Sequence, residues 1–289
     1  MSIGKTIGAY SMLGRVSNLP TCVTNVLVGT ALAINAGGFP SPEAFTLVLL
    51  SVVLFYIGGM ALNDVVDARR DVESGAKRPI PLGLITRRNA FAVAVLCFVG
   101  AMLCAVPLGP NAIGAAALLH LCIVAYNLLH KRWALFAVYM GLCRGLIYPY
   151  VVVAMGGTIQ DGTLWWFVGA ITAYTTFVTL VARREHARST TPAGWGALAM
   201  LAPFVVLVGV GSFPVAPVLG ASALFICWSV RNLLLGQEGN AKAAVMGWLA
   251  GMCAVDAVFL AALDRTGAMI VAMVALVFTA LWHKRISGT

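Results

Sequence analysis

Long apolar segments alternate with short polar connections along almost the whole chain. Each apolar segment reaches or approaches the roughly 20 residues that a helix needs to cross the hydrocarbon core of a bilayer. We therefore expect ten membrane-spanning helices, with nine as an alternative because the last four segments are short and closely spaced. The expected spans cover residues 16–36, 44–66, 89–107, 111–130, 134–156, 163–182, 193–211, 214–235, 243–263 and 268–283.

Composition excludes a water-soluble protein. Of the 289 residues, 61% are hydrophobic and only 10% are charged, whereas about 25% are charged in an average soluble domain. On folding, a soluble chain of about 300 residues buries about 75% of the surface that it exposes when unfolded. In a chain as apolar as this one, much of the surface that remains exposed would be apolar. The sequence predicts one all-α, polytopic membrane domain that covers residues 1–289.

Basic residues are distributed unevenly around the expected spans. The chain carries 19 Lys and Arg against 10 Asp and Glu, a net charge of +9. With the N-terminus in the cytoplasm, 17 of the 19 fall in cytoplasmic segments, while Arg265 lies on the opposite side and Arg144 inside a span. Cytoplasmic loops of membrane proteins are enriched in Lys and Arg. The pattern indicates this orientation, and the scatter in small groups argues against nucleic-acid binding.

Acidic residues, by contrast, gather at one point. Four of the ten lie in the segment NDVVDARRDVE of residues 63–73, at the end of the second expected span. On a helix, Asn63, Asp67 and Asp71 lie within an arc of about 80°. Oxygen ligands suit Mg²⁺, which takes its remaining oxygens from water and phosphate. The alternative is a solvated helix end with Asp–Arg ion pairs.

Two cations follow the acidic segment in the sequence KRPIPLG of residues 77–83. A diphosphate bound to a metal also needs Lys or Arg to neutralise its charge. Lys77 and Arg78 are therefore candidates for a diphosphate site beside the Mg²⁺ site. The alternative is that they only add to the cytoplasmic positive charge.

The combined pattern of residues 63–81 resembles the first aspartate-rich motif of the UbiA superfamily of intramembrane prenyltransferases. RVSNLPT at residues 15–21 resembles the start of the first helix of that family, and YNLLHK at residues 126–131 the Tyr and Lys at the end of its fourth. GLCRG at residues 141–145 is similar to the segment in its fifth helix. The resemblance implies a ring of nine or ten transmembrane helices around a central cavity, with Mg²⁺ and diphosphate near the cytoplasmic end.

The second aspartate-rich motif of the superfamily is missing. At its expected place, residues 179–188 read TLVARREHAR, with Glu185 as the single carboxylate. This resembles a branch found with Ebo-type bacterial gene clusters, which implies a bacterial plasma-membrane protein. Glu185 holds a second Mg²⁺ in one interpretation, and Arg183 or Arg184 binds diphosphate directly in another, since an Arg fork binds phosphate bidentately. In a third, transfer activity is lost or redirected.

One basic residue lies deep within a span. A charge inside the membrane is by default a functional hypothesis, and Tyr148 lies four residues after Arg144, on the same face of a continuous helix. Both are expected to line the cavity. The alternative is a structural Arg144 paired with Asp256, the one acid deep in a late span.

Apolar residues of the second span approach the acidic segment. Leu54, Phe55, Ile57 and Met60 are candidates to contact an isoprenoid tail. Ordinary helix packing is the alternative for each of them.

The resemblance implies Mg²⁺-dependent transfer of a prenyl group from a prenyl diphosphate to a small-molecule or lipid acceptor, such as a polyol, a cyclitol or an aromatic compound. The alternatives are a membrane terpene cyclase and a transporter or lipid-binding protein. Candidate residues are Asn63, Asp67, Asp71 and Glu185 for the metal, Asn18, Lys77, Arg78, Tyr126, Lys131 and Arg183 for the diphosphate, and Asp64, Arg144 and Tyr148 for catalysis.

Overall fold

The computed structural model describes residues 3–129, 137–185 and 193–283. Within these ranges the chain forms helices and no strands. The α-helices are α1 (Ile3–Leu13), α2 (Leu19–Asn35), α3 (Pro42–Glu73), α4 (Arg87–Ala105), α5 (Pro110–Leu129), α6 (Ala137–Gly145), α7 (Ile147–Ala154), α8 (Gly162–Glu185), α9 (Ala193–Leu201), α10 (Val205–Val210), α11 (Val215–Gln237), α12 (Ala241–Ala250), α13 (Met252–Ala262) and α14 (Thr266–Trp282).

Eight helical segments of the described chain are long and apolar enough to cross a membrane. They correspond to the first six, the eighth and the ninth expected spans, so the predicted all-helical membrane architecture is confirmed. The seventh and tenth expected spans are shorter apolar helices, Leu198–Val210 and Thr266–Trp282, and the count of ten is not confirmed. A 3-10 turn that contains Pro203 separates α9 from α10. Proline lacks the N–H that a continuous α-helix requires, which explains the interruption.

Two features of the helices differ from the expected pattern. A separate helix, α1, precedes the first span, with Ala9 and Leu13 buried and Ile7 exposed. The fifth expected span is divided into α6 and α7 at Leu146. Pro149 explains this break, since its ring clashes with the carbonyl of the residue four positions earlier, Gly145.

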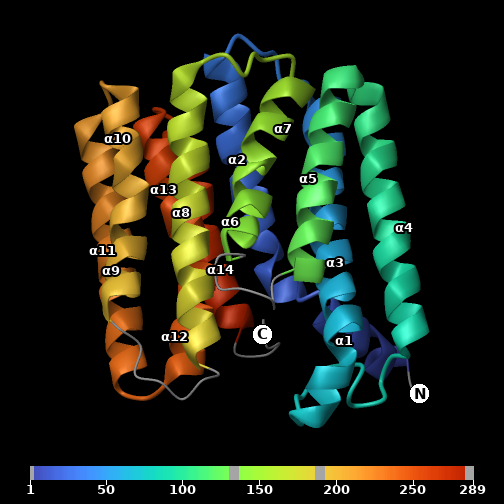
Figure 1. Cartoon of the computed structure of the whole chain (residues 1–289). Coiled ribbons are helices and arrows are strands. Elements are labelled where there is room, and N and C mark those ends of the chain that lie inside the picture. Colours follow the sequence, from blue (N-terminus) through green and yellow to red (C-terminus); the bar gives the residue numbers. More distant parts are fainter. Residues whose placement is uncertain (1–2, 130–136, 186–192, 284–289) are drawn as a thin grey trace.

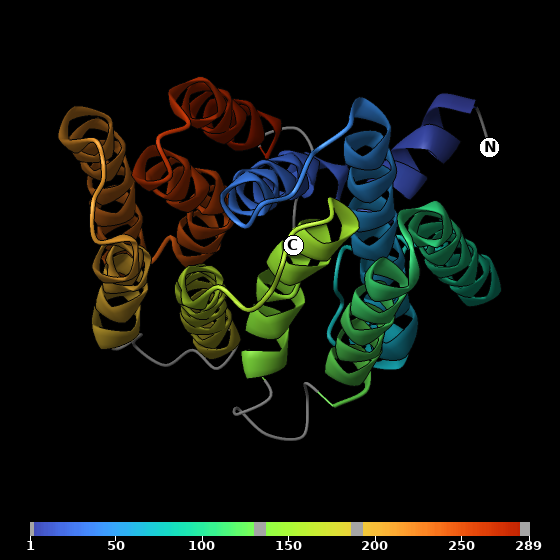
Figure 2. The same cartoon turned by 90° about the horizontal axis from the view of Figure 1, so that it is seen from above.

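The helices form two lateral groups with a central layer between them. Helices α3, α4 and α5 lie on one side, α8 to α14 on the other, and α2, α6 and α7 between them (Figures 1 and 2). All residues of α13, Met252–Ala262, are buried, and this helix packs against α2, α11 and α14. The polar residues that α13 carries therefore need partners inside the protein.

Helix α3 carries the acidic segment beyond the apolar layer. Ser41 caps its N-terminus by accepting a hydrogen bond from the Ala44 N–H, and Gly75 follows its end with a φ of +67°, as expected for a helix stop. Its 32 residues extend about 48 Å, compared with an apolar bilayer core of about 30 Å. We call the end of the bundle at which α3 finishes the motif end. Helix α1 lies at this same end (Figure 1).

Candidate functional site

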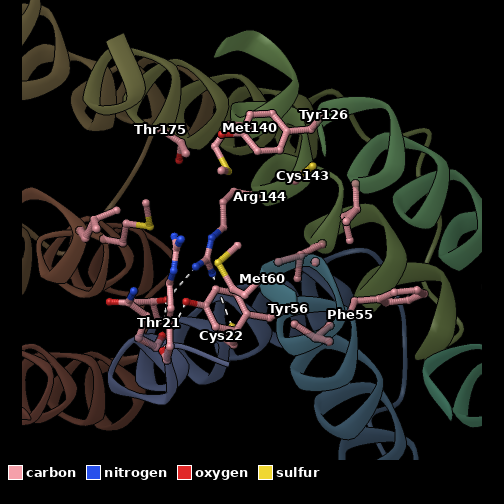
Figure 3. A pocket seen from close by; sticks show the side chains of 18 of the residues that line it. Thr21, Cys22, Phe55, Tyr56, Met60, Tyr126, Met140, Cys143, Arg144 and Thr175 are labelled. Carbon is pink, nitrogen blue, oxygen red and sulfur yellow. Dashed lines mark hydrogen bonds between the residues drawn. The ribbon is translucent and has the colours of Figure 1, made fainter. Parts of the chain in front are cut away.

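A cavity of about 140 Å³ lies inside the bundle, at the centre of the helices α2, α3, α5, α6 and α8 (Figure 3). Apolar side chains from α3, α5 and α7 line one part of it. Its polar lining residues are Arg15, Asn18, Thr21, Tyr56, Tyr126, Asn127, Arg144, Thr175 and Thr179. Phe55 and Met60 line it as well, whereas Leu54 and Ile57 do not. The cavity thus combines an apolar wall with a small set of hydrogen-bonding groups, as ligand sites commonly do.

The acidic segment is buried at the motif end of α3. Asn63, Asp67 and Asp71 are 8%, 8% and 7% exposed, and Asp64 is 2% exposed. The solvated helix end of the alternative is therefore wrong, whereas the Asp–Arg ion pairs that it predicted do form. Carboxylates taken out of water need cationic partners, so their surroundings decide what they do.

One arginine provides a shared cationic partner. The Arg78 guanidinium Nη1 donates to Asp71 Oδ2 at 2.8 Å and lies 3.5 Å from Asp64 Oδ1 and 3.7 Å from Asp67 Oδ2. Lys77, the other predicted cation, is exposed. Three carboxylates that are separated by up to seven residues on α3 therefore converge on a single positive group.

The chemistry of these oxygen donors suits a magnesium ion. Among the residues that the structure describes, no three His, Cys, Asp or Glu side chains adopt a preformed metal-binding arrangement. The carboxylates of Asp64, Asp67 and Asp71 nevertheless already share one cation. Hard oxygen donors with room for phosphate and water ligands are what Mg²⁺ requires.

Arg15 is a site residue that the sequence did not single out. It adopts the left-handed conformation, with a φ of 45°, which is uncommon for an arginine. Its Nη2 donates to Asp64 Oδ1 at 3.4 Å, and its carbonyl oxygen lies 3.5 Å from the Tyr56 hydroxyl. Because Arg15 also lines the cavity, it connects the cavity to the acidic segment. The segment RVSNLPT begins with Arg15, but nothing local to it indicated a contact with Asp64, 49 residues away.

Arg144 extends across the cavity from α6 toward α2 (Figure 3). Its side chain donates to Asn25 Oδ1 and Thr21 Oγ1, both at 2.9 Å, and its guanidinium lies 5.4 Å from the Tyr56 ring centre. The residue is 8% exposed and lines the cavity. The expectation that Arg144 lines the cavity is therefore confirmed, and the three partners Asn25, Thr21 and Tyr56 are uncharged.

Asp256 balances the positive charge of Arg144 indirectly, through Asn25. Asn25 Nδ2 donates to Asp256 Oδ1 and Oδ2 at 3.1 and 2.9 Å, Tyr148 donates to Oδ1 at 2.9 Å, and Thr24 donates to Oδ2. The alternative of a direct Arg144–Asp256 pair is wrong, because the Asn25 amide lies between them.

Tyr148 does not line the cavity, contrary to expectation. It is fully buried and bonded to Asp256. The spacing of four residues places two side chains on one face only of a continuous helix, and here α6 ends at Gly145, before α7 begins at Ile147. Its assignment as a catalytic residue stays a prediction.

Small residues of α6 bring it against α8 and so position Arg144. A Cβ atom at Gly141 would collide with the Thr172 carbonyl, and one at Gly145 with the Thr172 hydroxyl. Glycines four residues apart allow such close helix contact in membranes. The GLCRG segment therefore has a packing role around its arginine.

Asn18 and Tyr126 both line the cavity, as their predicted roles require. Asn18 Oδ1 lies 2.6 Å from His283 Nε2, just after the end of α14. This contact joins the C-terminal helix to the cavity.

Three candidate residues cannot be placed. Lys131 lies outside the described residues. Arg183 and Glu185 lie in the last turn of α8, and the structure describes their backbone but not their side chains. The roles predicted for them in diphosphate and metal binding stay predictions.

Known proteins resemble this chain over most of its length. The pattern of the UbiA prenyltransferase family matches residues 22–250, well over half of the chain. A 4-hydroxybenzoate octaprenyltransferase of Nitrosomonas europaea is 28% identical over 185 residues, which are 60% of this chain and 63% of that protein. The match thus spans slightly less than two thirds of the length of this relative. A digeranylgeranylglyceryl phosphate synthase of Natronomonas pharaonis is 33% identical over 96 residues, 33% of this chain and 35% of that protein.

Solved structures share the fold. A UbiA homolog from Aeropyrum pernix superimposes with a TM-score of 0.65 at 18% identity, covering 85% of this chain and 96% of that one. A UbiA homolog from Archaeoglobus fulgidus bound to DMAPP and Mg²⁺ gives a TM-score of 0.50 at 14% identity, covering 94% and 97%. The helical fold, the buried acidic segment and the family pattern agree, and the chain belongs to the UbiA prenyltransferase family.

Proposed function

We propose that this protein transfers a prenyl group from a prenyl diphosphate to an acceptor within the membrane. The observation that carries the proposal is the convergence of three buried carboxylates on Arg78 beside an apolar cavity. A diphosphate needs cations and a metal, whereas its isoprenoid chain needs an apolar space. Membership of the family supports the same activity.

The residues at the motif end would bind the diphosphate. Asn63, Asp67 and Asp71 would hold Mg²⁺, which supplies Lewis-acid stabilisation of the negative charge on a leaving phosphate. Arg78 already lies against Asp71, and Arg15 lies against the neighbouring Asp64. Both arginines would donate to the diphosphate oxygens. The Mg²⁺ and DMAPP bound by the Archaeoglobus fulgidus homolog support this assignment.

The cavity would hold the reacting carbon away from water. The C–O bond of the donor breaks, the diphosphate keeps the electron pair, and the allylic cation is captured by a nucleophilic atom of the acceptor, which then loses a proton. Val52, Phe55 and Leu119 line the apolar part of the cavity and would exclude the water that hydrolyses such a cation.

The polar lining favours an acceptor with hydrogen-bonding groups. Thr21, Arg144 and Thr175 face the cavity from α2, α6 and α8. A small polyol or cyclitol would use these groups, and so would an aromatic compound with polar substituents. The name of the Nitrosomonas europaea relative gives an aromatic acceptor for that protein.

Incubation of the protein in lipid nanodiscs with prenyl diphosphates, with and without Mg²⁺, tests the proposal. We expect diphosphate release that depends on Mg²⁺, and prenylated product when candidate acceptors are added. Release of a cyclic hydrocarbon without any acceptor would instead indicate a terpene cyclase. Absence of release from every donor would contradict the proposal.

Replacing Arg78 by glutamine is expected to weaken donor binding. The change removes the cation that lies 2.8 Å from Asp71, and hydrogen bonds to charged groups contribute about 1.5–3 kcal/mol. The KM for the prenyl diphosphate should therefore rise by about tenfold or more in a diphosphate-release assay.

Arg69→Gln is the matched control, because the Arg69 side chain is 93% exposed and pairs with the exposed Glu73. It should leave the KM close to that of the wild type. An equal rise in KM for both variants would point to general loss of positive charge rather than to a specific contact.

A further inference from the structure

A second hollow lies on the outer face of the protein between α4 and α5. It is lined from α4 by Val95, Phe98, Val99 and Leu103, among others, and from α5 by His120. Val99 and Leu103 are 51% and 63% exposed, and α4 is at the edge of the bundle (Figure 1). We call this hollow the α4 groove. In a membrane, an apolar groove at this place faces lipid tails.

Aromatic rings in two layers lie between the central cavity and the α4 groove. Phe55 lines the cavity, and its ring centre lies 6.4 Å from that of Phe98 and 5.8 Å from that of His120. Phe98 and His120 line the groove and stack on each other at 4.5 Å. We call these three residues the aromatic partition.

The backbone of α3 brings the partition together. A Cβ atom at Gly58 would lie 2.9 Å from the Phe98 ring, so the glycine lets Phe98 approach α3 one turn after Phe55. Phe55 itself is 1% exposed. The partition is therefore a packed wall with Phe55 on its cavity side and Phe98 and His120 on its groove side. Removal of the Phe55 ring would deepen the cavity toward the other two rings.

The size of the cavity and its position relative to Asn63 indicate that the aromatic partition limits the length of the prenyl chain. A cavity of about 140 Å³ resembles in volume the engineered cavities of about 150 Å³ that bind benzene, which suits a short prenyl group. Phe55 precedes Asn63 by eight residues, about 12 Å along α3. A chain attached to a diphosphate at the motif end would thus extend toward the partition.

We propose that the aromatic partition sets the length of the prenyl chain that the cavity accepts, with Phe55 as the specificity-determining residue. The inference rests on the proposed prenyl transfer. The protein uses short donors such as dimethylallyl or geranyl diphosphate in preference to long polyprenyl donors. When Phe55 is shortened, the tail of a longer donor extends into the space that the Phe55 ring occupied, as far as Phe98 and His120.

The test compares wild type and Phe55→Ala in nanodiscs over a series of dimethylallyl, geranyl, farnesyl, geranylgeranyl and octaprenyl diphosphates. The measured quantity is kcat/KM for Mg²⁺-dependent diphosphate release from each donor. We expect wild-type values to fall with chain length, and the ratio of long to short donors to rise at least tenfold in Phe55→Ala, a discrimination within reach of a few methylene groups in an apolar pocket.

Two further variants keep the test decisive. Phe55→Leu retains more of the side chain and should raise the ratio of kcat/KM for long to short donors by a smaller factor. This variant replaces Phe55→Ala in the test if Phe55→Ala does not fold. Phe91→Ala removes a ring from α4 that is 51% exposed and lies outside the partition, so it should leave the donor order unchanged.

The outcomes separate the two proposals. Diphosphate release with the same donor order in wild type and both Phe55 variants would overturn the role of the partition alone. A wild type that prefers octaprenyl diphosphate would also overturn it. Absence of release from any donor would overturn the prenyl-transfer proposal, and this inference with it.

Discussion

Replacing Asp67 by asparagine is expected to lower Mg²⁺-dependent diphosphate release by about 100-fold or more, the loss typical when one group that stabilises a developing anion is removed. Asp67 is 8% exposed, and its Oδ2 lies 3.7 Å from Arg78. The change keeps the size of the side chain but removes the charge that a metal ion requires. The rate of diphosphate release, measured over a range of Mg²⁺ concentrations, checks this prediction.

The same helix provides the control for Asp67. The Glu73 side chain is 62% exposed and pairs with exposed Arg69, so Glu73→Gln removes one carboxylate from the same segment without altering the buried cluster. This variant should keep most of the wild-type rate. If Asp67→Asn released diphosphate as fast as wild type, with the same Mg²⁺ dependence, the metal assignment would be wrong.

Replacing Asp256 by alanine is expected to have the largest effect on stability. Asp256 is fully buried and accepts hydrogen bonds from Thr24, Asn25 and Tyr148. Its removal leaves these donors without their acceptor and Arg144 without the nearby negative charge. Loss of one partner from a buried charged network costs about 3–5 kcal/mol. The thermal unfolding midpoint in detergent micelles should therefore fall clearly.

Asp264 provides a matched control on the same segment. It is exposed, and it has a φ of 57° just after the end of α13. Asparagine tolerates this left-handed conformation well, so Asp264→Asn should unfold at nearly the wild-type temperature. Equal unfolding temperatures for Asp256→Ala and wild type would show that the network around Arg144 contributes little to folding.

Most of the helical fold was predictable because whether a segment crosses a membrane depends on the composition of that segment alone. A segment of about 20 apolar residues is stable across a bilayer only as a helix, and eight such helices occur in the described chain. The break between α6 and α7 depends on Pro149. Proline kinks are tolerated in membrane helices, so hydropathy alone gives no sign of whether the helix continues.

The acidic part of the site was predictable because all its carboxylates lie on one helix. Periodicity alone places Asp67 and Asp71 on one face, and the structure buries both. Tyr56 and Met60 precede them at helical spacing and line the cavity, so the same periodicity identifies which side of α3 faces inward.

The partners of these residues come from distant parts of the sequence. Arg15 reaches Asp64 across 49 residues, and Arg144 contacts Asn25 across 119. No periodicity relates residues so far apart, because their approach depends on how whole helices pack.

The amino-acid sequence alone therefore determined the membrane environment, the helical class and the acidic motif, since each depends on composition or on spacing within one helix. Tertiary structure alone decided three other things: that Arg78 joins the carboxylates while Lys77 stays exposed, that Asp256 acts on Arg144 through Asn25, and that Phe55 of the cavity wall packs against Phe98 of the α4 groove. These depend on packing between helices, where low dielectric and close contact select among partners that the sequence makes equally available.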